Sequence, residues 1–156
     1  MYRLLISLVF ILLFVSCDPA RVYETNRDFE GALWPLADTA LFTFNISDTS
    51  LQYNIWINVR NSNDFKTSRL FLKYSLADSS NNPLRNRMLE EALFNKKTGE
   101  PFGSSGLGSI YVHRFLVESN INFPAQGRYS VKLNHMMRTD TLQEILSIGA
   151  RVEKVQ

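Results

Sequence analysis

Apolar and polar residues alternate in four stretches of the chain after residue 38. In the stretch 42–47, the apolar side chains of Phe42, Phe44 and Ile46 share one face and polar side chains share the other. The same period of two recurs in three later stretches, at 53–60, 70–76 and 129–135. A period of two places successive side chains on opposite faces of a strand. The pattern therefore predicts four half-buried β-strands.

Further strands are predicted from shorter patterns. Asp28 to Trp34 resembles a first edge strand with a turn at Gly31, and two other candidates are 109–116 and 147–153. The stretch 89–94 is compatible with a strand or with a helical turn, and 141–148 with one short helix. Polar or glycine-containing clusters that favour turns separate these segments, at 61–64, 78–83, 97–101, 103–108 and 124–127.

This spacing of strands and turns indicates the fold class. About seven or eight short strands without a repeat period are typical of an all-β protein in which two antiparallel sheets pack face to face. We therefore expect an antiparallel β-sandwich of jelly-roll type, with room for one short helix.

The first seventeen residues follow a different pattern. Arg3 precedes an apolar run from Leu4 to Val15, and Ser16 precedes the one cysteine of the chain, Cys17. The run is shorter than the roughly 20 residues of a membrane-spanning helix. Phe14 stands where ordinary secretory cleavage prefers a small residue, and where a lipoprotein signal usually has Leu. The layout predicts a lipoprotein signal peptide that is removed at Cys17, which then carries lipid.

This prediction divides the chain into three parts. Residues 1–16 are the signal peptide, 17–37 the lipidated N-terminus with the segment that leads into the domain, and 38–156 the β-sandwich. Removal of the signal peptide leaves 140 residues, the size of one ordinary domain. The net charge of +2 comes without a basic tract, so we expect no nucleic-acid partner.

The sequence contains little that predicts chemistry. The two histidines, His113 and His135, have no second histidine or carboxylate at metal-ligand spacing, and both are expected to be structural. The glycines of 103–108 lack the spacing of a dinucleotide fingerprint, and no G-x-S-x-G nucleophile motif occurs. A lipidated Cys17 is excluded from thiol catalysis and metal binding. We therefore expect no catalytic, cofactor or metal site and a protein that is not an enzyme. An enzyme would need carboxylates, or a histidine and a carboxylate, that converge only in space.

Two aromatic residues stand on the polar faces of their strands. Trp56 and Phe71 alternate with apolar neighbours that face the predicted core. Exposed aromatic side chains on a sandwich are typical of sugar-binding modules, so a lipid-anchored glycan-binding module is the alternative function. Burial of both side chains would remove its main support.

Sequence blocks along the whole domain resemble the gliding motility lipoprotein GldH family. The blocks occur in the order Cys17-Asp18, Val22-Tyr23-Glu24, Tyr53 to Phe65, Leu70-Phe71-Leu72, Gly106 to Tyr111, Asn122 to Tyr129, Met137 to Asp140 and Ile148 to Lys154. Each block is a strand or turn pattern with little chemical content, and their order and co-occurrence carry the resemblance. Only the lipidated cysteine transfers residue by residue, to Cys17.

The resemblance implies a lipid-anchored, non-catalytic component of the bacterial gliding motility machinery. It implies a membrane attachment through Cys17, most simply to the outer membrane facing the periplasm, and protein partners in the gliding and secretion machinery. The family also occurs in bacteria that do not glide, so a role in the cell envelope is the more general expectation. The turn clusters 61–64 and 103–108 are candidate partner-contact loops, and the candidate contact residues are Trp56, Asn61, Asn63 and Asp64.

Overall fold

The four period-two segments are strands in the computed structural model, which describes residues 18–106 and 108–155. They are β3 (Ala40–Ile46), β4 (Tyr53–Ser62), β5 (Arg69–Asp78) and β9 (Gly127–His135). Side chains of β3 alternate strictly between buried and exposed along its seven residues. The alternation in sequence is therefore the alternation between core and surface.

Four more long strands complete the two main sheets, and three short strands lie at their ends. The long strands are β1 (Arg21–Asp28), β6 (Pro83–Ala92), β8 (Ile110–Ile121) and β11 (Ile145–Lys154). The short strands are β2 (Leu33–Pro35), β7 (Ser104–Ser105) and β10 (Thr141–Gln143), and a 3-10 turn, η1 (Glu30–Ala32), precedes β2.

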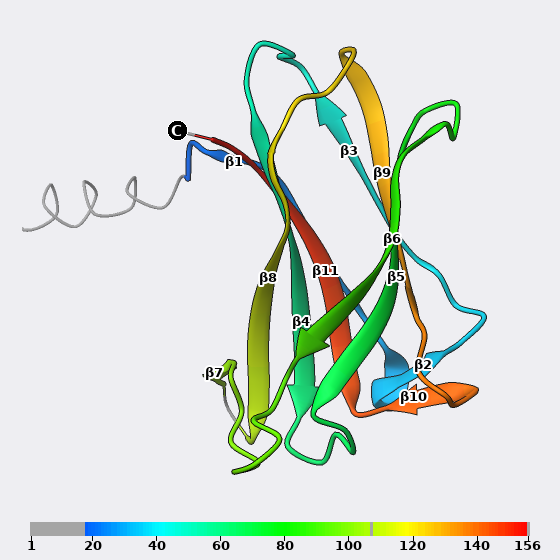
Figure 1. The fold of residues 1–156 in the computed structure, drawn as a ribbon, viewed down its shortest axis with the longest axis vertical. Helices are drawn as coiled ribbons and strands as arrows, with labels where there is room; N and C mark the ends of the chain where they lie inside the picture. Colours follow the sequence, from blue (N-terminus) through cyan, green and yellow to red (C-terminus); the bar gives the residue numbers. More distant parts are fainter. Residues whose placement is uncertain (1–17, 107, 156) are drawn as a thin grey trace, which may run out of the picture.

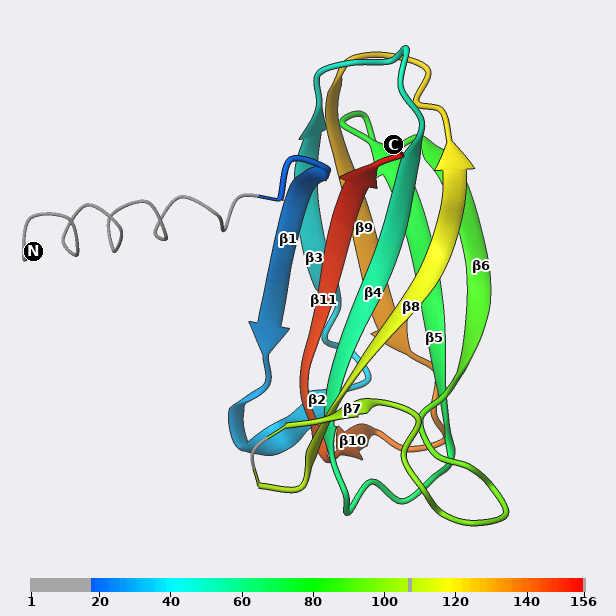
Figure 2. The ribbon, with the colours of Figure 1, turned by 90° about the vertical axis from the view of Figure 1, so that its left-hand side faces the viewer.

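The long strands form two packed antiparallel sheets (Figure 1). One sheet has the order β1-β11-β4-β8-β7 and the other the order β3-β9-β5-β6. Strands β10 and β2 form a small separate sheet at the lower end of the molecule in Figure 2. The order of the eight long strands is that of a jelly roll, a two-sheet fold built from two Greek-key motifs. The predicted all-β sandwich of jelly-roll type is confirmed.

The core lies between the two sheets and is almost entirely apolar. It is formed by inward side chains from both sheets, including Ile55, Ile57, Val59, Leu70, Leu72, Tyr74, Val131, Leu133, Ile148, Ala150 and Val152. Burial of this surface is the main force that holds the sheets together, at roughly 25 cal/mol per Å² of apolar surface. At one edge of the sandwich the rings of Tyr23 and Phe44, 5.8 Å apart, connect β1 to β3.

At the other edge, a β-bulge in β8 turns a carboxylate inward. Leu116 lies opposite Trp56, whereas Ile55 lies opposite Glu118, so Val117 is the extra residue. The bulge shifts the alternation of β8 by one residue. Glu118 is therefore buried, and Arg87 and Arg85 of β6 approach its carboxylate at 3.2 and 3.7 Å. These ion pairs connect the edges of the two sheets.

Two local predictions are wrong. Residues 141–148 form no helix: they hold β10, Glu144 in the left-handed region (φ 67°) and the start of β11. Pairing of β10 with β2 buries Leu142, and tertiary pairing overrides local propensity here. The first edge strand is Arg21–Asp28 rather than Asp28 to Trp34, although the turn at Gly31 (φ 61°) is where it was expected. The ambiguous stretch 89–94 contains the end of strand β6.

The described part of the N-terminal segment, residues 18–37, contributes to the sandwich. Its strand β1 pairs with β11 from Arg21 to Asp28. The predicted signal peptide 1–16 and the predicted lipidation site Cys17 lie outside the described residues. Within the part of the chain that the structure describes, no helix has the length and apolar character needed to cross a membrane.

Gly149 permits the close approach of β1 to β11. A Cβ atom at this position would lie 1.9 Å from Oδ1 of Asn26 and 2.8 Å from the main-chain oxygen of Thr25. We predict that Gly149→Ala displaces β1 and lowers the free energy of unfolding by about 1–3 kcal/mol, the usual cost of overpacking. Urea unfolding and hydrogen exchange of the β1 amides measure both effects.

Gly99→Ala is the matched control. Gly99 has φ 74°, and a Cβ added there would have no neighbouring atom within 4 Å, so its substitution strains only the local backbone. Hydrogen exchange in β1 should stay unchanged in this control. If the β1 amides of Gly149→Ala exchange as slowly as in the natural chain, the close approach of β1 to β11 does not depend on Gly149.

Candidate functional site

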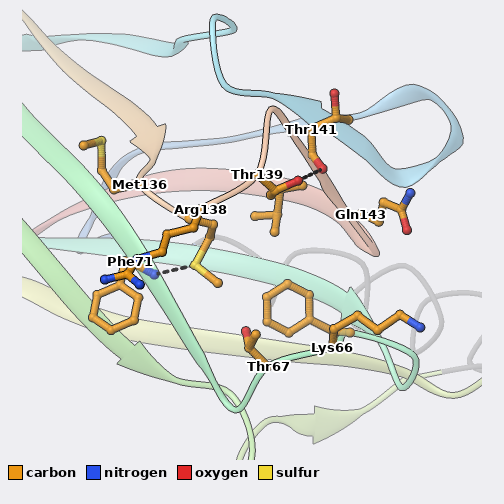
Figure 3. A pocket seen from close by; sticks show the side chains of 11 residues that line it. Lys66, Thr67, Phe71, Met136, Arg138, Thr139, Thr141 and Gln143 are labelled. Carbon is orange, nitrogen blue, oxygen red and sulfur yellow. Dashed lines mark hydrogen bonds between the residues drawn. The ribbon is translucent and has the colours of Figure 1, made fainter.

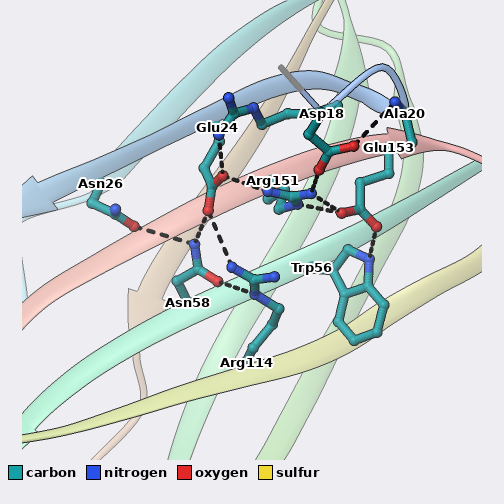
Figure 4. A network of polar contacts seen from close by, with 10 residues as sticks. Asp18, Ala20, Glu24, Asn26, Trp56, Asn58, Arg114, Arg151 and Glu153 are labelled. Atoms are coloured by element: carbon teal, nitrogen blue, oxygen red, sulfur yellow. Dashed lines mark hydrogen bonds and ion pairs between the residues drawn. The ribbon is translucent and has the colours of Figure 1, made fainter. Parts of the chain in front are cut away.

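A buried arginine lies at the centre of a polar network on the outer face of the five-stranded sheet. Arg151 projects from β11 and is only 7% exposed. Its guanidinium contacts the carboxylates of Glu24 on β1, at 2.6 Å, of Asp18 and of Glu153 (Figure 4). A buried charge is tolerated when it is paired and hydrogen-bonded, and three carboxylates satisfy that condition here.

Hydrogen bonds extend this network over neighbouring strands. Asn58 of β4 donates its amide N–H to Glu24 at 3.1 Å, and Arg114 of β8 donates to the Asn58 side-chain oxygen at 3.2 Å. The indole N–H of Trp56 donates to Glu153 at 2.9 Å. We call this set the Arg151 network; its members are Asp18, Glu24, Trp56, Asn58, Arg114, Arg151 and Glu153. It spans β1, β11, β4 and β8, which are consecutive in the sheet.

The network changes the acidity of its members. Burial acts to raise the pKa of Glu24, but hydrogen bonds from Arg151, Arg21 and Asn58 outweigh it and hold the pKa below the ordinary 4.5. The hydrogen bond from Arg151 is the main cause that lowers the pKa of Asp18 below 3.8. Burial would lower the pKa of Arg151, yet its hydrogen bonds to the carboxylates raise it. All of these groups are therefore charged at neutral pH.

Asp18 connects the network to the predicted anchor. It follows Cys17 by one peptide bond, and its carboxylate also accepts a hydrogen bond from the main-chain N–H of Ala20 at 3.2 Å. The main-chain oxygen of Ala20 accepts a bond from Lys154 at 2.8 Å. Residues 18–20 are therefore fixed on the sheet, at the end of the sandwich where β1 begins and β11 ends (Figure 2). We call this the Asp18 end.

A pocket of about 770 Å³ lies at the opposite end. We call it the β10 pocket; its lining residues are Phe65, Lys66, Thr67, Phe71, Met136, Met137, Arg138, Thr139, Thr141, Leu142 and Gln143 (Figure 3). They come from the β4–β5 loop, the start of β5, the β9–β10 loop and β10. Two stretches that are distant in sequence, 65–71 and 136–143, thus form one concave surface.

Strand β11 separates the two sites. Gln143 lines the pocket just before β11, and Arg151 lies near the far end of that strand. Eight residues of extended chain, at about 3.3 Å each, span roughly 25 Å. The β10 pocket therefore lies at the other end of β11 from the Asp18 end.

The two histidines are buried in the sandwich and do not line the β10 pocket. The His113 ring stacks on Phe115 at 5.8 Å, and the His135 ring packs edge-on against Trp34 at 5.4 Å. Among the described residues, Nε2 of each histidine has no hydrogen-bond partner. Burial lowers the pKa of His113 to about 4 and also lowers that of His135. In residues 18–106 and 108–155, no group of three His, Cys, Asp or Glu side chains could hold a metal ion.

The predicted contact residues have different environments. Asn61 is fully buried, whereas Asn63 and Asp64 are exposed in the β4–β5 loop, next to the pocket-lining Phe65. Trp56 is half-buried and belongs to the Arg151 network. In the cluster 103–108, Gly103 packs tightly, since a Cβ there would lie 2.8 Å from Nε2 of His113.

Neither the Arg151 network nor the β10 pocket was predicted from the sequence. A signal for the network exists: Arg151 interrupts the apolar run Ile148-Gly149-Ala150-Arg151-Val152. A charged residue amid apolar neighbours indicates a partner of opposite charge. No comparable signal exists for the pocket, because its lining combines residues from the ranges 65–71 and 136–143.

The fold and the network together define a class of protein: a single jelly-roll domain whose first residues after a predicted lipoprotein cysteine are bound to one end of the sheet. The profile of the GldH lipoprotein family matches residues 21–152. The chain therefore belongs to the GldH lipoprotein family, and the resemblance seen in the sequence is confirmed.

Individual relatives agree over nearly the full length. The gliding motility lipoprotein GldH homolog of Christiangramia forsetii is 29% identical over 160 residues, covering 98% of this chain and 96% of the relative. The gliding motility lipoprotein GldH of Flavobacterium johnsoniae is 25% identical over 157 residues, covering 96% and 94%. Among solved structures, the 4-O-methyl-alpha-glucuronidase BtGH115A of family GH115 gives a TM-score of 0.46 at 13% identity, over 90% of this chain and 18% of that chain.

We predict that Arg151→Met lowers the free energy of unfolding by about 2–4 kcal/mol, because three carboxylates then lack their shared cation. The carboxylates retain some contact with water, which keeps the loss below that of a fully buried pair. Arg114→Met is the control. Because the Arg114 side chain is 48% exposed, this substitution should lower the free energy of unfolding by less than about 1 kcal/mol. Urea unfolding at pH 7 measures both variants, and equal losses would contradict a central role for Arg151.

We also predict that stability falls as the pH drops from 6.5 towards 4. Buried His113 remains neutral down to about pH 4, whereas the unfolded chain takes up a proton below about 6.5. The folded state therefore loses up to about 3 kcal/mol across this window. His113→Leu should flatten this part of the stability curve, measured by urea unfolding at a series of pH values. Loss of the Glu24 and Asp18 contributions occurs at lower pH, since their folded pKa values lie below 4.5 and 3.8. An unchanged slope in the variant would exclude His113 as its cause.

Proposed function

We propose that this protein is a lipid-anchored, non-catalytic component of the envelope machinery for gliding motility. Its lipid is carried by Cys17, and its domain lies on the periplasmic face of the outer membrane. Membership of the GldH lipoprotein family supports the assignment to gliding motility. The observation that carries the anchoring role is the contact between Asp18, the neighbour of Cys17, and the buried Arg151.

This contact has a mechanical consequence for an anchored domain. A flexible tether would let the domain sample many orientations, whereas residues 18–20 are bound to the sheet immediately after the cysteine. Two or three acyl chains hold a protein on its membrane stably, since each buried CH₂ contributes about 0.8 kcal/mol. Confinement to the membrane raises the effective concentration of the domain near other membrane-bound components.

The β10 pocket has the side chains for binding rather than for catalysis. Its lining offers apolar surfaces, hydroxyl groups and two cations, and it includes no carboxylate or imidazole that could act as a general base. We therefore assign it a role in contact with protein partners of the machinery.

A glycan-binding module is the second candidate function. Phe71 is 36% exposed at the β10 pocket, which favours it, and Trp56 is half-buried. Trp56 lies on the outer face of the five-stranded sheet and Phe71 on that of the four-stranded sheet, so the two rings do not form one platform. Binding to a glycan array that is abolished by Phe71→Ala would favour this candidate.

We predict that Cys17→Ala removes lipid and releases the protein from the membrane. In cells given a clickable palmitate analogue, the natural chain should be labelled and should co-sediment with the outer membrane on a density gradient. The variant should be unlabelled and should not restore spreading to a gliding relative that lacks its own family member. A variant that stays membrane-bound without label would contradict the anchoring role. Asp64→Ala is a control that keeps Cys17 and should retain label and membrane location.

A further inference from the structure

The β10 pocket is lined by a strand edge. All three residues of β10 line it, whereas none of β2 does, so the pocket lies on the side of β10 away from β2. The main-chain N–H of Leu36 donates to the oxygen of Asp140 at 2.8 Å, one residue beyond the Thr141–Pro35 pair. In an antiparallel ladder this bond makes Thr141–Pro35 a non-hydrogen-bonded pair, and Gln143–Leu33, two residues on, another.

The main-chain groups of Thr141 and Gln143 therefore point away from β2. A second contact agrees with this direction: the oxygen of Thr141 accepts a hydrogen bond at 3.0 Å from the hydroxyl of Thr139, which also lines the pocket. A strand edge with outward N–H and C=O groups is a template on which an extended peptide can add a strand.

The apolar part of the pocket lies beside this edge. Phe71 and Met136 are 36% and 45% exposed, and Met137 contacts the main-chain N–H of Phe71 through its sulfur at 3.4 Å. Methionine side chains are flexible and polarisable, and they adapt to apolar partners of different shape. Exposed apolar side chains in a concave surface indicate a binding role.

The charge of the lining is entirely positive. Lys66 and Arg138 are both exposed, and neither forms an ion pair among the described residues. Figure 3 shows them on different segments, Lys66 in the β4–β5 loop and Arg138 in the β9–β10 loop. No acidic side chain lines the pocket, so a partner that carries carboxylates is complementary to it.

We propose that the β10 pocket binds an extended segment of a partner protein in which apolar residues are interspersed with Asp or Glu. The segment adds a strand to β10, places an apolar side chain against Phe71 and the methionines, and places its carboxylates near Lys66 and Arg138. The inference rests on the proposed function only in that the partner belongs to the cell envelope. It specifies the chemistry of that partner and the end of the domain at which it binds.

The test uses the purified full-length protein and a display library of random nonapeptides. We expect selection of peptides that combine apolar residues with Asp or Glu. The selected peptide, labelled with a fluorophore, should bind Arg138→Glu about fivefold more weakly, since one favourable charge contact becomes unfavourable. Arg128→Glu is the matched control, because Arg128 is an exposed arginine on β9 outside the pocket. It should bind with unchanged affinity.

Two further measurements examine the strand pairing and the occupant. Methylation of alternate peptide nitrogens should weaken binding about tenfold in one register and little in the other, because only one set of N–H groups faces β10. Library selection on Arg138→Glu should shift towards Lys and Arg.

Several outcomes would overturn the proposal. The first is that the selected peptides are not enriched in Asp or Glu. The second is that Arg138→Glu and Arg128→Glu lose the same binding affinity. The third is that N-methylated peptides of both registers bind as tightly as the unmodified peptide. Concentration-dependent dimerisation of the protein that is lost in Arg138→Glu would instead identify a second copy as occupant. The Cys17→Ala experiment is independent of these assays, so failure of the peptide assay with normal anchoring rejects only the pocket inference. Failure of anchoring with specific peptide binding rejects only the proposed function.

Discussion

The arrangement of this domain depends on the compensation of one buried charge. Arg151 lies in a strand whose other face packs in the core, and its guanidinium has little contact with water. An unpaired charge in that position would cost several kcal/mol, so the carboxylates of Glu24 and Asp18 must lie beside it. This requirement holds β1 on the edge of the sheet and fixes the residues that follow Cys17. The position of the predicted anchor is thereby coupled to the fold.

A second buried charge connects the opposite edge of the sandwich. The bulge at Val117 directs Glu118 into the space between the sheets, where arginines from β6 approach it. The Arg151 ion pairs join β1 to β11 within one sheet, whereas the Glu118 ion pairs join the edges of the two sheets. Apolar burial holds the centre. The ends of the sandwich are formed by loops and short strands, which add Trp34 and Leu142 to the core and also present the exposed residues of the β10 pocket.

The two ends have different properties. The Asp18 end is occupied by the network that binds the N-terminal segment, and the β10 end has a pocket with exposed apolar and cationic side chains. Asp18, which follows the predicted lipidation site in sequence, and the pocket thus lie at opposite ends of β11. Attachment of lipid next to Asp18 would leave the β10 end free for contacts. The chain belongs to the GldH lipoprotein family, in line with a lipid-anchored protein of the cell envelope.

By itself the sequence determined the fold class, because a period of two along strands such as 53–60 reflects burial of one face. It also predicted Cys17 as the lipidation site, and the order of short sequence blocks indicated the family. The tertiary structure alone decided that 141–148 contain strands and not the predicted helix, because Thr141–Gln143 pair with β2. It also decided the inward turn of Glu118, which depends on a bulge across from β4. The Arg151 network and the β10 pocket join residues more than 60 positions apart, and no local pattern encodes such proximity.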